Sequence, residues 1–486
     1  MVFQNNVLSG AAGSGTTVHT IDQSIRFNDD DSAYMSRTFS ASNRKTLTFS
    51  CWVKRGNQGT NQNIFGPQTS NSGSGSYGVI RLNPQNELDI FDYTNGTTNW
   101  RLQSTQLLRD SSAWYHFVFS MDTSNSISSE RLRMYINGQR VTDFDVETQP
   151  SLNYEGQWNN NLSHEIGAIQ RGSTNQYFDG YLAEIVFIDG QALSCDSFGE
   201  FNSSGIWIPK NVSALTFGTN GFHIDGRDAS DLGDDESGNG NDFTTSGLAA
   251  HDQVLDSPTN NFSTMNPLAN PGSATVAEGN LKATMASGTK KGIYNNIAIS
   301  SGKWYVEGRL TSSNNGSQYA YTGIEDYNSA INSGQYIGRD TYGYSYDPAN
   351  GGVLHNNSYV VSSGTLPSLA QNDIVQIAVD LDNNYIYWGK NGTFLNSGDP
   401  TSDSSGTGGV SVIDPASQPS GHYHIGHGNG TGSSGYQSEI VWNFGQDSTF
   451  AGATTAGGNS DGNGIGNFKY SVPSGFLALC TKNLGS

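Results

Sequence analysis

Apolar and polar residues alternate with a period of two over many short stretches of this chain, which is typical of half-buried β-strands. Residues 133–141 and 385–394 share one arrangement, in which an alternating run precedes Asn-Gly and a short second run follows it. Asn-Gly favours the type I′ turn that joins two antiparallel strands. A further alternating run that ends in aspartate precedes each hairpin, at 114–122 and 373–382. We therefore expect two copies of a three-stranded antiparallel unit.

The other strand patterns fall into two groups, separated by a stretch of different character. We expect one β-sandwich over 21–205 and a second over 273–486. Between them, residues 206–272 are rich in Gly, Asp and Asn, which indicates a connector with little core of its own. Residues 1–20 are small and polar and are expected to form an N-terminal arm. The predicted fold class is all-β, with two antiparallel β-sandwiches joined by this connector.

Composition and charge exclude several classes of function. The chain of 486 residues has 24 basic and 44 acidic residues, a net charge of −20, which disfavours binding to phosphate backbones and to anionic membrane surfaces. Neither a run of 18 apolar residues nor a signal-peptide pattern is present, so we expect no membrane insertion. Three cysteines are too few for a disulfide framework or a zinc site, and we expect them to be buried: Cys51, Cys195 and Cys480.

Motifs in both halves resemble known β-sandwich families. TFSCWVKR (48–55), LRMYINGQRV (132–141) and FDGYLAEIVFIDGQALS (178–194) resemble laminin-G-like members of the concanavalin A-like superfamily. GKWYVEGRL (302–310) and DIVQIAVDLDNNYIYWGKNG (373–392) resemble SPRY domains. Both families are antiparallel sandwiches of the jelly-roll type. The resemblance therefore implies that the hairpin recurs because the fold recurs.

Nearly the whole chain also resembles structural proteins of bacteriophages, especially of marine phages. RFNDDDSAYMSRTFS (26–40), DSPTNNFSTMNPL (256–268) and VPSGFLALCTKNL (472–484) carry this resemblance. It implies a virion component that is made in the host cytoplasm and exposed on the particle surface. Its partners would be other virion proteins, and we expect a homo-oligomer, with a trimer favoured. The arm would attach the protein to the virion through its few apolar residues, Val2, Phe3, Val7 and Leu8.

The function implied by these resemblances is recognition without catalysis. A tail or head fibre, or a decoration protein, would bind a host surface glycan or protein through its lectin-like sandwiches, with weak sites strengthened by multivalency. A purely structural role, as a cement or linker between virion proteins, remains open. A glycan depolymerase is a more distant alternative.

The candidate for catalysis is the sequence ELDIFD at 87–92. A retaining glycanase needs two carboxyl groups about 5 Å apart on one face. Glu87 and Asp89 share a strand face by the period of two, but Asp92 falls on the other face and Phe91 takes the third position. We therefore expect an exposed strand face and no catalytic residue.

Aromatic residues are the better candidates for ligand binding. Trp100 and Trp158 lie among Asn, Gln and Gly, where a flat apolar ring could stack on a sugar. Residues 319–346 hold seven tyrosines among small polar residues, a composition typical of adaptable recognition surfaces. The alternative, that these tyrosines pack inside the sandwich, remains open. The tyrosines proposed to bind ligand are Tyr319, Tyr321, Tyr336, Tyr342 and Tyr344.

Two groups of residues are candidates for metal binding. Carboxylates on a flexible Gly-rich loop suit calcium, although their spacing matches no EF-hand and a solvated acidic loop is the alternative. The candidate calcium ligands are Asp228, Asp231, Asp234, Asp235 and Asp242. His422 and His424 would point the same way on a strand, either as a metal-binding pair or as two solvent-facing histidines.

Overall fold

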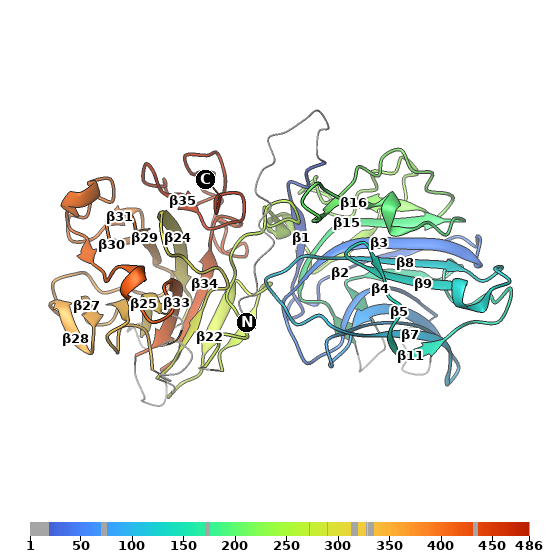
Figure 1. Cartoon of the computed structure of the whole chain (residues 1–486), viewed down its shortest axis with the longest axis horizontal. Helices are drawn as coiled ribbons and strands as arrows, with labels where there is room; N and C mark the ends of the chain where they lie inside the picture. The colour runs from blue at the N-terminus through green and yellow to red at the C-terminus, as the bar shows by residue number, and fades with distance from the viewer. Residues whose placement is uncertain are drawn as a thin grey trace. The chain divides into compact units, whose positions relative to one another are not determined.

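The computed structural model describes residues 19–69, 75–170, 175–271, 273–288, 290–312, 319–326, 328, 335–430 and 436–485. The chain divides into two compact units, residues 1–261 (unit 1) and residues 262–486 (unit 2). Both units are built from β-strands (Figure 1), and the predicted all-β fold class is confirmed. No helix in the described ranges is long and apolar enough to cross a membrane.

Unit 1 contains two eight-stranded antiparallel sheets. The first sheet consists, in spatial order, of β10 (Gln139–Arg140), β9 (Leu132–Ile136), β8 (Tyr115–Asp122), β3 (Thr46–Arg55), β15 (Gly180–Asp189), β1 (Ser24–Phe27) and β20 (Gln253–Val254), with β18 (Phe222–Ile224) also paired to β15. The second consists of β11 (Phe144–Thr148), β7 (Thr97–Leu107), β6 (Glu87–Thr94), β5 (Tyr77–Leu82), β4 (Gln62–Gln68), β12 (Ser163–Ile166), β2 (Tyr34–Thr38) and β19 (Thr244–Ser246). Unit 1 also has, among its described residues, the pairs β13 (Ala168–Ile169) with β14 (Gln176–Tyr177) and β16 (Gly199–Phe201) with β17 (Trp207–Pro209), and the short 3-10 turns η1 (Ser128–Glu130), η3 (Cys195–Ser197) and η4 (Ala250–Asp252).

The alternating pattern of each strand decides which side chains enter the core between these two sheets. Phe117 and Phe119 of β8 point into that core, whereas Val118 points to a smaller cluster on the opposite face of its sheet. Phe49 of β3 stacks on Phe65 of β4, with ring centroids 4.7 Å apart, and so joins one sheet to the other. Packing of this kind is what a β-sandwich requires of two facing sheets.

The segment predicted as a connector is largely part of unit 1, which corrects the expected domain boundaries. Residues 206–261 lie in unit 1 and contribute β17 to β20. β18 and β20 extend the first sheet and β19 extends the second, so this stretch supplies edge strands to both. Most of its large apolar residues are buried, with Phe222 at 0% and Phe243 at 2% exposure. The sequence did not predict these strands, because each is only two or three residues long and the segment around them is polar.

Unit 2 also contains two sheets around one core. The larger consists of β21 (Thr275–Ala277), β22 (Lys282–Met285), β34 (Ser438–Asn443), β24 (Lys303–Leu310), β29 (Ile374–Asp380), β30 (Tyr385–Lys390) and β31 (Thr393–Phe394), with β32 (Val410–Ser411) paired to β30 and β35 (Leu477–Ala478) parallel to β24. The smaller consists of β23 (Gly292–Tyr294), β33 (Tyr423–Asn429), β25 (Ala320–Asp326), β26 (Gly343–Asp347), β27 (Gly352–His355) and β28 (Ser358–Val361). Two 3-10 turns, η5 (Asp403–Ser405) and η6 (Pro415–Ser417), lie in the loops.

Both predicted hairpins are confirmed. β9 and β10 are joined by Asn137 and Gly138, whose φ angles are 48° and 76°. β30 and β31 are joined by Asn391 and Gly392, with φ angles of 49° and 91°. Positive φ at both turn positions is the requirement that Asn-Gly satisfies at low cost. In each unit the preceding strand, β8 or β29, pairs with the first strand of the hairpin.

We expect residues 262–486, expressed alone, to give one cooperative thermal transition. Both sheets of unit 2 are formed from this segment alone, and their shared core supplies the apolar burial that drives folding. Calorimetry on the purified fragment measures the transition. A fragment that aggregates, or melts without cooperativity, would show that unit 2 needs residues from unit 1.

Candidate functional site

A cavity of about 300 Å³ lies beside β15 in unit 1 and is lined mainly by polar side chains. Glu184 of β15 and His223 of β18 lie at the buried end, with exposed fractions of 9% and 7%. Arg227 and Glu236 follow β18 in the chain and line the exposed side. Ligand sites in proteins are usually concave and combine apolar walls with a few convergent polar groups, so this cavity is more polar than most.

Glu184 owes its position to an irregularity in β15. The pairing of β15 with β3 shifts register between Ala183 and Val186, which is a β-bulge. Within this bulge Glu184 has a φ angle of 48°, in a region that residues other than glycine rarely adopt. Bulges of this kind redirect a side chain out of the regular alternation. Here the bulge turns a carboxylate into the cavity from the middle of a buried strand.

The buried end of the cavity holds a carboxylate and an imidazole in direct contact. His223 Nε2 lies 2.8 Å from Glu184 Oε2, and His19 Nε2 lies 3.9 Å from Glu184 Oε1. Burial by itself would raise the pKa of Glu184, but the two histidines outweigh it and lower this pKa to about 2. Burial likewise opposes the charge on His223, yet the bond to Glu184 raises the pKa of this imidazole above its ordinary value. The cavity therefore keeps a permanent carboxylate and a basic imidazole side by side.

The exposed side of the cavity adds a second set of charged groups. The Arg227 guanidinium pairs with Asp225 and lies 3.7 Å from Glu236 Oε2. The Arg227 side chain remains 63% exposed. Carboxylate acceptors and guanidinium or imidazole donors thus line one small cavity together. Such a mixture suits a neutral ligand with many hydroxyl groups better than it suits an ion of either sign.

A second candidate surface is the outward face of β5 and β6 in the second sheet of unit 1. The Tyr77 ring lies 5.6 Å from Phe91 and 5.0 Å from Tyr93, between ring centroids. The Arg81 and Arg101 guanidinium groups lie 4.9 Å and 5.7 Å from the centroid of Phe91. Tyr77 and Tyr93 are half-buried, so part of each ring faces solvent. Partly exposed aromatic rings beside charged groups can stack on sugar faces.

The candidate catalytic strand lies on this surface, and its carboxylates are all buried. Glu87 is 5% exposed, and Asp89 and Asp92 are 0% exposed, so the expected exposed strand face is wrong. Asp89 forms ion pairs with Arg81 at 2.9 Å and with Arg101 at 2.7 Å. Glu87 and Asp89 are on the face opposite the core residues of β6, as the period of two predicted. A carboxylate held by two arginines is a poor nucleophile, so these ion pairs do not favour a catalytic role for Asp89.

We expect no release of reducing ends when the protein is incubated with β-glucans or bacterial surface polysaccharides. Asp89 is neutralised by two arginines, and Glu87 accepts hydrogen bonds from Asn83 at 2.7 Å and Gln103 at 2.6 Å. A reducing-sugar assay measures the outcome, with Glu87→Gln as the matched variant. Hydrolysis that is lost in this variant would contradict the expectation.

The two tryptophans proposed to bind sugar are both in the core, which corrects that prediction. Trp100 is 0% and Trp158 is 1% exposed, and both belong to the cluster between the sheets of unit 1. Their ring centroids lie 6.3 Å apart. Polar neighbours in the sequence suggested exposure, but Trp100 follows the alternation of β7 and points inward.

Most of the proposed tyrosines also pack within unit 2. Tyr344 is 4% exposed and lies in the core, while Tyr321 and Tyr336, at 6% and 7%, pack together with Leu354. Tyr319 is half-buried, and its ring lies 4.7 Å from that of Tyr436. Tyr342 is 38% exposed. The alternative of packing therefore holds for Tyr321, Tyr336 and Tyr344, and Tyr342 is the most exposed of the five candidates.

The five aspartates proposed as calcium ligands are not arranged to hold a metal ion. Asp228, Asp231 and Asp242 accept hydrogen bonds from the main-chain amides of nearby turns, and Asp235 accepts three such bonds and is 7% exposed. Asp234 is partly buried, and burial raises its pKa. Across the described ranges, no group of three or more His, Cys, Asp or Glu side chains is arranged to hold a metal ion. The carboxylates instead fix the turns of this loop.

The predictions for the histidine pair, the cysteines and the N-terminal arm had different outcomes. His424 is 5% exposed and its Nδ1 lies 2.9 Å from the main-chain oxygen of Asn295, so a solvent-facing pair with His422 is wrong. All three cysteines are buried, as predicted. Of the predicted arm, the structure describes His19 and Thr20. The proposed attachment residues Val2, Phe3, Val7 and Leu8 lie outside the described residues.

Comparisons with known proteins support the assignment of unit 1. Residues 27–196 match the concanavalin A-like lectin/glucanases superfamily. No curated protein matches the chain significantly. Similar solved structures include the SPRY domain of human HERC1, which is 16% identical and covers 36% of this chain and 96% of its own, with a TM-score of 0.27. A SAP-like pentraxin from Limulus polyphemus is 16% identical, over 37% of this chain and 80% of its own, and the TRIM65 PSpry domain is 9% identical, over 37% and 91%, both with TM-scores of 0.27.

The residues that line the cavity were not predicted from the sequence. Glu184 lies in a strand that reads as continuously buried, and His223 lies in the segment taken as a connector. The one available signal was a glutamate in the centre of an otherwise apolar strand, GYLAEIVFID. A buried charge usually has a partner, but the sequence did not indicate that His223 is that partner.

Proposed function

We propose that this protein is a non-catalytic recognition protein of a virion, which binds a host surface glycan through unit 1. The observation that supports this most directly is the cavity lined by Glu184, His223 and Arg227, which combine acceptor and donor groups. The match of residues 27–196 to a lectin superfamily agrees with carbohydrate or protein binding. The assignment to a bacteriophage particle rests on the sequence resemblance described above.

The size of the cavity and the net charge of the chain restrict which ligands can bind. A volume of about 300 Å³ suits one or two sugar residues of a longer glycan. The chain carries a net charge of −20, so strongly anionic polysaccharides would be repelled at long range. We therefore expect a neutral glycan with weak affinity at each site, strengthened by many copies on one particle.

Glycan-array binding followed by calorimetric titration tests this proposal. We expect Arg227→Ala and Glu236→Ala each to weaken binding of the selected glycan by about tenfold or more, equivalent to about 1.4 kcal/mol. Both side chains are exposed, so the fold should tolerate their removal. Tyr93→Ala, on the second candidate surface, is the matched control and should bind like the unmodified protein.

Two results would redirect the proposal. Loss of binding in Tyr93→Ala, with normal binding in the cavity variants, would assign recognition to the outward face of β5 and β6. Absence of binding to any glycan, together with labelling of the chain between capsid or tail subunits in intact particles, would favour the structural role of a virion cement.

A further inference from the structure

Lys54 is a buried lysine at the end of β3, within unit 1. Its Nζ atom lies 2.5 Å from Asp256 Oδ2 and 2.7 Å from Asn261 Oδ1. The exposed fractions of the Lys54 and Asp256 side chains are 1% and 0%. Burying such a pair costs desolvation energy that its attraction seldom recovers, so stability alone is a weak reason to keep it. A buried amine, a carboxyl group and a side-chain amide in contact can also react with one another.

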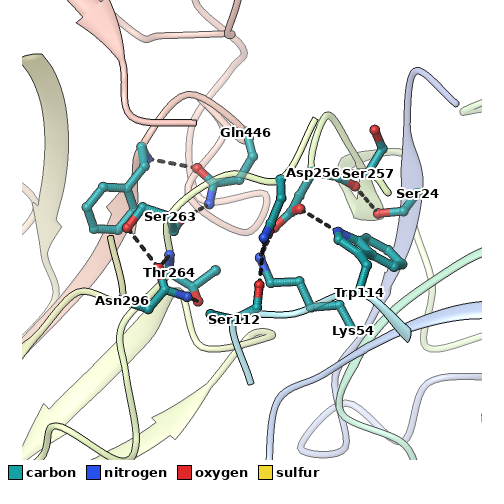
Figure 2. A network of polar contacts seen from close by, with 12 residues as sticks. Ser24, Lys54, Ser112, Trp114, Asp256, Ser257, Ser263, Thr264, Asn296 and Gln446 are labelled. Atoms are coloured by element: carbon teal, nitrogen blue, oxygen red, sulfur yellow. Dashed lines mark hydrogen bonds and ion pairs between the residues drawn. The ribbon is translucent and has the colours of Figure 1, made fainter. Parts of the chain in front are cut away.

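Aromatic rings surround the amine and the carboxylate. Trp114 Nε1 donates a hydrogen bond to Asp256 Oδ1 at 3.0 Å, and Lys54 Nζ lies 5.6 Å from the centroid of the Tyr181 ring. Figure 2 shows Lys54 and Trp114 meeting at Asp256, while Ser24 Oγ donates to the main-chain oxygen of Asp256 at 2.5 Å. These contacts hold the carboxylate in one orientation beside the amine.

The amide of Asn261 is oriented by a separate contact. Its Nδ2 atom donates a hydrogen bond to the main-chain oxygen of Ser112 at 2.6 Å. The carbonyl oxygen of the same amide therefore faces Lys54, and the nitrogen faces away. The carbonyl carbon lies one C=O bond, about 1.2 Å, from the oxygen that Lys54 already contacts. This is the orientation needed for the amine to approach the carbonyl and for the amide nitrogen to leave.

The surroundings also favour the reactive form of the amine. Burial lowers the pKa of Lys54, although the charge and the hydrogen bond of Asp256 oppose this effect. A lysine whose pKa falls can give its proton to an adjacent base and become a nucleophile. Asp256 is the base in direct contact, and in the protonated form it can return that proton.

We propose that Lys54 and Asn261 form an intramolecular isopeptide bond, with Asp256 as the group that carries the protons. Asp256 takes a proton from the Lys54 ammonium, and the Nζ lone pair attacks Cγ of Asn261 to give a tetrahedral intermediate. Asp256 protonates the oxyanion, then takes the second proton from Nζ. As the carbonyl re-forms, the Cγ–Nδ2 bond breaks. Asp256 gives its proton to the leaving nitrogen, which departs as ammonia, and the hydroxyl proton of the intermediate passes back to Asp256. One Nζ–Cγ bond replaces one Cγ–Nδ2 bond, and no oxidant or cofactor is needed.

The bond would close a long loop. It joins β3, which pairs with both β8 and β15 inside the first sheet, to the last residue of unit 1. Cross-links that close long loops remove much of the conformational freedom of the unfolded chain. Tension applied to the chain at residue 261 would then pass directly to an internal strand. A protein exposed on a particle surface gains resistance to unfolding and proteolysis from such a link.

The intact mass of the denatured full-length protein tests the proposal directly. We expect a mass lower than that calculated from the sequence by one ammonia. Proteolysis should release a branched peptide that contains both Lys54 and Asn261, and trypsin should not cleave after Lys54. A mass equal to the calculated value, with an unbranched peptide and normal cleavage, would overturn the proposal.

Variants test the roles of the three residues. Lys54→Arg, Asn261→Ala and Asp256→Asn should each restore the mass calculated for their own sequences. Asn211→Ala, which changes an asparagine elsewhere in unit 1, is the matched control and should keep the bond. A bond that persists in Asp256→Asn would overturn the role of Asp256. If circular dichroism shows a misfolded variant, the mass and the peptide map of the unmodified protein decide the question alone.

Discussion

Replacing Trp100 by alanine is expected to lower the free energy of unfolding of unit 1 by about 3–5 kcal/mol. The indole is completely buried between the two sheets, with its ring centroid 5.7 Å from that of Phe119 and 6.3 Å from that of Trp158. Removing it leaves a cavity that the rigid sheets on either side cannot close. Denaturant unfolding followed through the transition of unit 1 measures the loss.

Leu107→Ala provides the matched control for Trp100→Ala. Leu107 is in the same strand, β7, but is 43% exposed, so its truncation should change stability by less than about 0.5 kcal/mol. The two variants together separate burial from residue size. If the Trp100 variant keeps the free energy of unfolding of the unmodified protein but loses glycan binding, the original prediction that this ring stacks on a sugar would be restored.

Acidification below about pH 6.5 is expected to destabilise both units. Burial lowers the pKa of His116, His164 and His427 to about 3 and that of His424 to about 4. Their ordinary value is about 6.5, so below that pH the unfolded chain binds protons that the folded chain cannot. Each histidine then costs roughly 1.4 kcal/mol for every further pH unit, until its folded pKa is reached.

Other groups modify this acid profile. Glu165, whose pKa burial raises to about 7, acts in the opposite sense, because the folded chain binds its proton first as the pH falls towards 4.5. Glu184, with a pKa lowered to about 2, adds to the loss of stability below about pH 4.5. His223, whose pKa is raised, contributes stability that is lost as the pH rises above about 6.5. Burial also raises the pKa of Glu307 and Asp92, which act in the same sense as Glu165. We expect the four histidines and Glu184 to outweigh these groups and to give a net loss of stability in acid.

Thermal or denaturant unfolding between pH 7 and pH 4 measures this effect. His116 accepts a hydrogen bond from Trp207 Nε1 at 3.0 Å, and its Nε2 lies 2.8 Å from Ser50 Oγ. His116→Gln keeps a side chain that can make hydrogen bonds and removes the titration, so unit 1 should lose stability less steeply in acid. An unchanged slope would contradict the assignment of His116 as a source of acid lability.

The local predictions succeeded where neighbouring residues decide the structure. Asn137-Gly138 and Asn391-Gly392 form the turns that were predicted, because the requirement for positive φ is met by two adjacent residues. The inward and outward faces of β6 also agree with the period of two, with Leu88 and Ile90 in the core. Exposure was predicted less well. Trp100 is buried because it packs on Phe119 of the facing sheet, and Asp89 is buried because the Arg81 and Arg101 side chains of the neighbouring strands pair with it.

The sequence by itself determined the all-β class, the two sandwiches and their repeated hairpins, since alternation and turn chemistry act over a few residues. Only the tertiary structure decided which residues meet. Glu184 and His223 come together because β18 pairs with a bulged β15, and Lys54, Asp256 and Asn261 because the end of unit 1 returns to β3. Glu184 and His223 are 39 residues apart in the sequence, and Lys54 is more than 200 residues from both Asp256 and Asn261. No local sequence pattern encodes a contact over such separations.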